Sequence, residues 1–168
     1  MPIPGIQGNF SEALYIDYDK GEKPSLSSTG IMSATIINSV KNLSVSLGAG
    51  YTTNSKNIAG VVFEGKGTYS FNEYTNMQLR IRSSHSEAVD KTQFRLSPGF
   101  KYKVADKTTL YANPYVSANI DYRSDKCSLD YGVFAGITQG LGNNIKLSIE
   151  GQRYHDHWGT NIIASFNF

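Results

Sequence analysis

The residues best suited to chemistry gather in one short run, RYHDHW, which extends from Arg153 to Trp158. It brings His155, Asp156 and His157 together. A histidine oriented by a carboxylate could activate a nucleophile, but the run contains no serine or cysteine to serve as one. In an extended strand the two histidines would project to the same side and could instead share a metal ion. We keep both histidines as catalytic candidates, but we expect a polar turn here, with no metal and no cofactor.

The rest of the sequence offers no familiar enzymatic motif. It has no P-loop, no dinucleotide-binding glycine turn and no G-x-S-x-G elbow. The net charge of +2 is too small to indicate a nucleic-acid partner. A single cysteine, Cys127, excludes an internal disulfide framework and a cysteine-based zinc cluster. The length of 168 residues suits one domain, which we assign to residues 1–168.

Period-two alternation of apolar and polar residues runs through almost the whole chain. In the segment 43–52, for example, an apolar face begins at Leu43 and a polar face begins at Ser44. The 16 glycines and 11 tyrosines also favour pleated sheets with tight turns over helices. The pattern predicts ten strands in an antiparallel meander, with eight strands and longer loops as the alternative. Closure into an up-and-down barrel would remove the two free edges of such a sheet.

Alternation does not decide which face of the barrel points outward. A soluble barrel of the lipocalin kind would enclose the apolar face and bind an apolar ligand, whereas a membrane barrel turns that face to lipid. Strands of about 9–12 residues match a tilted bilayer crossing. Aromatic residues also sort to the strand ends, as bilayer interfaces require. One rim would hold Tyr51, Phe63, Phe94, Tyr122 and Trp158, and the other Tyr69, Phe71, Phe100, Tyr102, Phe166 and Phe168. We therefore predict a transmembrane barrel in contact with membrane lipid.

The polar face then lines the barrel interior. A turn at residues 72–74 would place Glu64 opposite Arg82 and Lys66 opposite Arg80. Charged side chains in a narrow barrel can interlock through hydrogen-bonded ion pairs, so we expect a largely plugged interior. The predicted network contains Glu64, Lys66, Arg80, Arg82, Arg95, Lys101, Asp121, Asp130 and Glu150. Inward glycines are expected to make room for the arginines, namely Gly48, Gly50, Gly99, Gly132 and Gly136.

Two prolines interrupt neighbouring strands. Pro98 and Pro114 flank the same predicted turn almost symmetrically, so they should lie nearly opposite each other. Proline has no amide hydrogen to donate to the ladder. The pair could therefore open a local gap in the wall that admits a lipid tail, or it could be a bulge that the barrel tolerates.

The chain ends in TNIIASFNF, with Ile162, Ala164, Phe166 and Phe168 on one face of the last strand. This ending resembles the C-terminal assembly signal of bacterial outer-membrane β-barrels, and the chain as a whole resembles small barrels of the OmpX or opacity-protein class. The resemblance implies an outer-membrane location and insertion by the outer-membrane assembly machinery. The first residues, MPIPGIQGNF, have no basic or apolar region typical of a signal peptide, so we expect a mature chain from which the signal has been removed.

The resemblance also implies a monomer whose longer links face outward, around Lys20–Ser28, Thr53–Asn57, Ser84–Lys91 and Arg123–Lys126. We expect a structural or surface-interaction role, or limited permeation of small solutes. The alternatives are a soluble barrel that binds an apolar ligand and a lipid or peptide hydrolase with its site at the rim.

Overall fold

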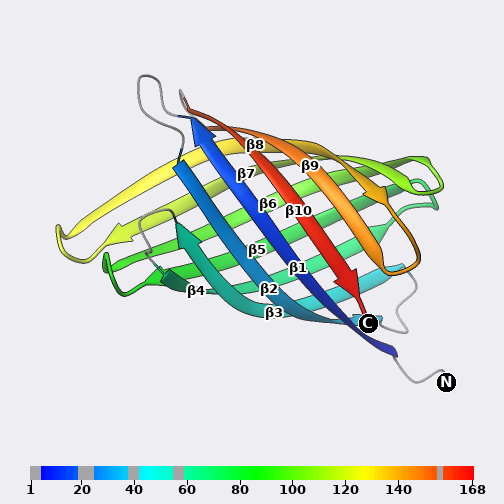
Figure 1. Cartoon of the computed structure of the whole chain (residues 1–168), viewed down its shortest axis with the longest axis horizontal. Coiled ribbons are helices and arrows are strands. Elements are labelled where there is room, and N and C mark those ends of the chain that lie inside the picture. The colour runs from blue at the N-terminus through cyan, green and yellow to red at the C-terminus, as the bar shows by residue number, and fades with distance from the viewer. Residues whose placement is uncertain (1–4, 19–24, 38–41, 55–58, 155–156) are drawn as a thin grey trace.

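In the computed structural model the chain is a closed barrel of ten antiparallel strands (Figure 1). The structure describes residues 5–18, 25–37, 42–54, 59–154 and 157–168. The strands are β1 (Gly5–Tyr18), β2 (Ser25–Ile37), β3 (Leu43–Asn54), β4 (Ala59–Ser70), β5 (Thr75–Ser86), β6 (Lys91–Ala105), β7 (Thr108–Asp121), β8 (Lys126–Gly140), β9 (Ile145–Tyr154) and β10 (His157–Asn167). Each strand pairs with its neighbours in sequence. The prediction of an up-and-down barrel is confirmed, with ten strands rather than eight.

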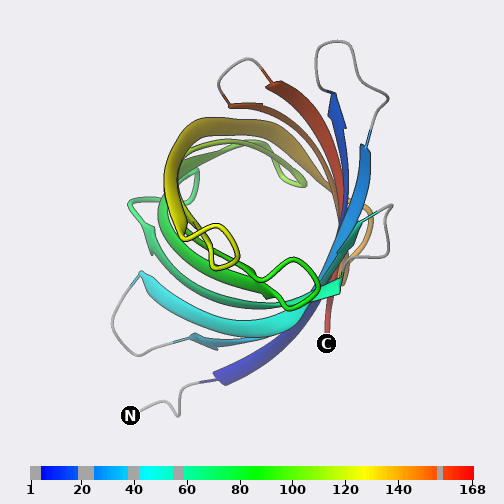
Figure 2. The ribbon, with the colours of Figure 1, turned by 90° about the vertical axis from the view of Figure 1, so that its left-hand side faces the viewer.

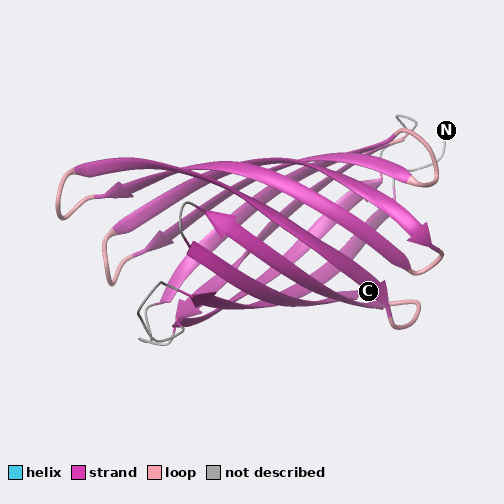
Figure 3. Ribbon diagram, turned by 90° about the horizontal axis from the view of Figure 1, so that it is seen from above, coloured by secondary structure: helices cyan, strands magenta, loops and turns pink. Residues whose placement is uncertain are grey.

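The barrel closes by pairing its first strand with its last. Seen end-on, the strands follow one another around a single ring (Figure 2), and from above they cross the barrel at a marked tilt (Figure 3). The register of β1 and β10 runs from Asn9–Asn167 to Tyr18–Trp158. Beyond it, Gly8 and Phe168 exchange two backbone hydrogen bonds of 3.1 Å each. The last residue is therefore held in the sheet, which explains why the apolar alternation continues to the end of the chain.

The apolar face of the barrel points outward. Leu47, Phe100 and Val116 are 64, 57 and 45% exposed. All eleven aromatic residues of the two predicted rims are likewise exposed. No helix in the described part of the chain is long and apolar enough to cross a membrane. This orientation confirms the membrane-barrel prediction and is the reverse of what a soluble barrel with an apolar ligand requires.

The inward face is mostly polar. Its buried residues include Gln78, Ser97, Asn113, Ser117 and Asn161. A smaller apolar group is buried with them and consists of Ala13, Ile31, Val62, Tyr115 and Phe134. Polar groups removed from bulk water require partners, so the contacts among these side chains determine the state of the interior.

The turns are tighter than the sequence suggests. The predicted loop Ser84–Lys91 shrinks to residues 87–90, because Ser86 still pairs with Lys91. The turn at 71–74 is built by Asn72, whose Oδ1 accepts the backbone N–H groups of Tyr74 and Thr75 at 2.9 and 2.7 Å. Among the described links, 71–74, 87–90, 122–125 and 141–144 have four residues each, and 106–107 has two. The links 87–90 and 122–125, which were expected to be long, are therefore no longer than 71–74 and 141–144, since cross-strand pairing extends into segments that look polar and loop-like.

The ladder between β6 and β7 has a local break. Pairing runs to Leu96–Val116 and resumes at Phe100–Ala112 in the same register, which places Pro98 opposite Pro114. Both prolines are exposed on the outer wall. Neither can donate a backbone hydrogen bond, so one rung of the ladder is missing at this point.

The inward glycines have different neighbours from those expected. A Cβ at Gly132 would meet the hydroxyl of Tyr115 at 2.6 Å, and a Cβ at Gly136 would meet that of Tyr111 at 2.7 Å. A Cβ at Gly99 would collide with the side chain of Asn113. The expectation that these glycines accommodate arginines is wrong, because a glycine makes room for the residue on the adjacent strand.

Candidate functional site

The barrel interior contains a cavity of about 360 Å³. Its described lining comes from every strand except β3. The charged residues of the lining are six cations, Lys66, Arg80, Arg82, Arg95, Lys101 and Lys146, and two carboxylates, Glu64 and Glu150. This excess of four positive charges makes the cavity the candidate functional site.

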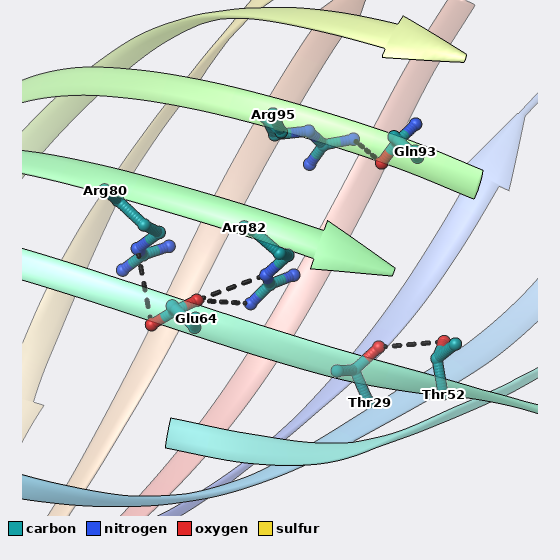
Figure 4. A network of polar contacts seen from close by, with 7 residues as sticks. All are labelled: Thr29, Thr52, Glu64, Arg80, Arg82, Gln93 and Arg95. Carbon is teal, nitrogen blue, oxygen red and sulfur yellow. Dashed lines mark hydrogen bonds and ion pairs between the residues drawn. The ribbon is translucent and has the colours of Figure 1, made fainter. Parts of the chain in front are cut away.

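Glu64 is the centre of the strongest ionic group in the cavity. Arg82 lies directly across the β4–β5 ladder, and its Nη2 and Nε donate to Oε2 of Glu64 at 2.9 and 3.1 Å. Nε of Arg80 lies 3.7 Å from the other carboxylate oxygen. Figure 4 shows the two guanidinium groups converging on the one carboxylate. The predicted turn placed Glu64 opposite Arg82, and this register is observed. The charge of Glu64 is therefore shared between two cations.

Two amides connect Arg95 to a carboxylate. Its Nη2 donates to Oε1 of Gln93 at 3.1 Å (Figure 4). Gln93 donates in turn to Oδ1 of Asn119 at 2.7 Å, and Asn119 donates to Asp130. The predicted members Arg95 and Asp130 thus belong to one hydrogen-bonded chain that crosses β6, β7 and β8.

The guanidinium of Arg95 also stacks on aromatic rings. Its central carbon lies 4.5 Å from the ring centre of Tyr115 and 5.2 Å from that of Phe134. The two rings stack on each other with their centres 4.7 Å apart. Cation–π contacts of this kind stabilise a guanidinium that has left bulk water. The stack holds Arg95 in place against the barrel wall.

The other predicted acidic residues lie apart from the Glu64 group. Glu150 accepts a hydrogen bond from the amide of Asn161, which faces it across β9 and β10. Asp121 forms an ion pair of 3.1 Å with Lys91 at the ends of β6 and β7, and it does not line the cavity. Among the described residues, the predicted set therefore does not form a single ion-pair network, because Glu150 bonds to an amide and Asp121 lies outside the cavity.

Three lysines of the cavity lie apart from the carboxylates that the structure describes. Within the described residues, no carboxylate lies within 4.0 Å of the ammonium groups of Lys66, Lys101 or Lys146. The strands on the other side of the ring, β1, β2 and β10, contribute only uncharged side chains to the cavity. The described lining is therefore basic along β4, β5, β6 and β9, and rich in hydroxyl and amide groups along β1, β2 and β10.

Several contributors to this site were not predicted as site residues. They are Gln93, Asn119, Tyr111, Lys146 and Asn161. All five occupy polar-face positions of alternating segments, and this alternation was the signal that could have identified them.

The histidine candidates contribute no described site. His155 lies outside the described residues, and His157 is the first residue of β10. No group of three or more histidine, cysteine, aspartate or glutamate side chains in the described part of the chain could hold a metal ion. The four residues of the predicted assembly signal lie in or just after β10, and Ile162, Phe166 and Phe168 among them are exposed.

No protein-family model and no curated protein matches the sequence. Solved structures do match the fold. An outer membrane channel from Pseudomonas putida F1 is similar over 100% of this chain and 97% of its own, with a TM-score of 0.59 and 9% identity. The KdgM porin in complex with disordered oligogalacturonate has a TM-score of 0.55, with 12% identity and coverage of 98 and 99%. The NanC porin also has a TM-score of 0.55, with 11% identity and coverage of 98 and 99%.

These identities are low, so the similarity concerns the fold. It agrees with the outward apolar face, the two aromatic rims and the closure of β1 on β10. The protein is therefore a ten-stranded β-barrel with the fold of outer-membrane channels.

Proposed function

We propose that the protein resides in the bacterial outer membrane and provides a narrow passage for small polar solutes. The observation that carries this proposal is the cavity of about 360 Å³ inside the apolar-faced barrel, lined by polar and charged side chains. A cavity with such a lining holds water and solutes that form hydrogen bonds. The fold shared with the KdgM and NanC porins supports the same function.

The size of the barrel limits what it can pass. Barrels with few strands leave little free space between their inward side chains, whereas porins with about 16 strands enclose a wide aqueous channel. Here the side chains of Arg80, Arg82 and Arg95 extend into the cavity. We therefore assign the passage to inorganic ions and molecules of a few heavy atoms, not to oligomers.

A plugged barrel with a structural role is the second candidate function. It is favoured by the hydrogen bond of 2.6 Å from Nε2 of Gln78 on β5 to Oδ1 of Asn113 on β7, which links two non-adjacent strands on the inner wall. Together with the Glu64 group, this contact narrows the lumen. Under this alternative the barrel would insert into membranes and conduct nothing.

Planar-bilayer recording separates the two functions. The chain is refolded in detergent, its heat-modifiable gel mobility is checked, and it is inserted into a bilayer bathed in potassium chloride. Discrete conductance steps are expected, and they should grow in Arg95→Ala because that change removes a long side chain from the lumen. If the original chain and the Arg95→Ala chain both fold and insert but neither conducts, the result would support the structural role.

A further inference from the structure

The three lysines that form no ion pair with a described carboxylate come from three parts of the barrel wall. Lys66 lies on β4, Lys101 on β6 and Lys146 on β9, and all three line the same cavity. Arg80 lines this cavity too, directly across the β4–β5 ladder from Lys66. The same cavity thus gathers Arg80 and the three lysines.

The two carboxylates of the described cavity lining already have other partners. Glu64 already holds Arg82 at 2.9 Å and Arg80 at 3.7 Å. The other cavity carboxylate, Glu150, accepts the amide of Asn161. Like charges that are partly withdrawn from water repel one another strongly and are stabilised by a counter-ion. Among the described residues, the chain supplies no such counter-ion for Lys66, Lys101 and Lys146.

Hydroxyl groups of the cavity lining lie next to two of its cations. Ser165 sits across the β9–β10 ladder from Lys146, and Ser97 sits across the β5–β6 ladder from Arg80. An oxyanion can accept hydrogen bonds from both ammonium and hydroxyl groups. These donors come from β4, β6, β9 and β10, and donors that approach from several strands suit an anion with several acceptor oxygens.

We propose that Lys66, Lys101 and Lys146 form an anion-binding site in the lumen, specific for small oxyanions such as phosphate and simple carboxylates. The site makes the proposed passage selective for anions, and this part of the inference rests on the proposed function. A narrow passage with low-dielectric walls concentrates the field of the lysines and raises the local concentration of anions. The ligand is a free solute rather than a lipid headgroup, because the lining residues face the lumen and the barrel wall separates them from the membrane.

The first experiment measures ion selectivity in a planar bilayer across a potassium chloride gradient. The original chain should show a reversal potential that favours chloride. In Lys101→Gln/Lys146→Gln the ratio of chloride to potassium permeability should fall by about threefold or more. The matched control is Lys107→Gln/Lys126→Gln, which removes the same charge from exposed lysines outside the cavity and should keep the original ratio. Equal ratios in all three chains would refute the selectivity.

The second experiment does not depend on conduction. Thermal unfolding of the barrel is followed in lipid-free detergent as inorganic phosphate replaces chloride at constant ionic strength. A ligand that binds only the folded state raises the midpoint with its concentration. Phosphate should stabilise the original chain and the control. The apparent affinity of the barrel for phosphate should weaken by about tenfold or more in Lys101→Gln/Lys146→Gln.

The outcomes of the two experiments separate the two proposals. If phosphate stabilises the barrel but the barrel conducts nothing, the anion site is supported and the proposed passage is refuted. If the barrel conducts without anion preference and phosphate does not stabilise it, the passage is supported and the anion site is refuted. If phosphate stabilises the lysine variant as much as the control, the site is overturned as well.

Discussion

Arg82 on β5 faces Glu64 on β4, and its Nη2 lies 2.9 Å from Oε2 of that carboxylate. Both side chains are largely removed from solvent, with exposed fractions of 17 and 14%. Arg80 reaches the second oxygen of the same carboxylate at 3.7 Å. Glu64 is thus the carboxylate that both of these β5 arginines contact.

Replacing Glu64 should destabilise the barrel more than replacing an exposed glutamate. Glu64→Gln leaves the guanidinium groups of Arg80 and Arg82 without their carboxylate, which should cost about 1–3 kcal/mol. The control is Glu73→Gln in the exposed turn after β4, which should change stability little. Urea unfolding in lipid vesicles, followed by the fluorescence of the single tryptophan, Trp158, measures both. Equal stability of the two variants would contradict a stabilising role for Glu64.

Alanine at Gly136 should impair folding, whereas alanine at Gly67 should not. A Cβ at Gly136 would meet the backbone carbonyl of Ile149 and the hydroxyl of Tyr111, while a Cβ at Gly67 has nothing within 4 Å. Because backbone on a paired strand cannot move aside easily, Gly136→Ala should lose about 1–3 kcal/mol. The fraction of chain that acquires heat-modifiable gel mobility after refolding reports the difference. Similar folded fractions would show that β8 and β9 separate more readily than the geometry indicates.

The break at Pro98 and Pro114 should appear in hydrogen exchange. Amides of residues 96–100 and 112–116 should exchange faster than those of 134–138, because β8 pairs continuously with both β7 and β9 there. Restoring two donors with Pro98→Val/Pro114→Val should slow the exchange of the first two segments. Full protection of both segments in the original chain would remove the idea of a gap in the wall.

Changing the last side chain should affect assembly in cells more than folding in vitro. Phe168→Ser keeps the two backbone hydrogen bonds with Gly8, so the refolded barrel should still close. If Phe168 belongs to an assembly signal, the variant should accumulate outside the outer membrane in a bacterial host. Phe100→Ser removes another exposed aromatic residue and serves as the control. Equal outer-membrane levels of the two variants would argue against the signal.

Local patterns in the sequence were enough to predict the strands, their number and the outward direction of the apolar face. Each of these follows from the two-residue period of a strand and from the distribution of aromatic residues along it. The pairing of Glu64 with Arg82 was predictable for the same reason, since a turn of known position sets the register of the two strands it joins.

Relationships between strands that are distant in the sequence could not be derived in this way. The meeting of Lys66, Lys101 and Lys146 in one cavity, and the hydrogen-bonded chain from Arg95 to Asp130, depend on how β4 to β9 are staggered around the ring. Alternation shows which side chains face the lumen, but it does not show at which height along the barrel axis they meet. That height is set by the closure of β1 on β10 and by the tilt of every strand between them, because closing the sheet couples all ten registers at once.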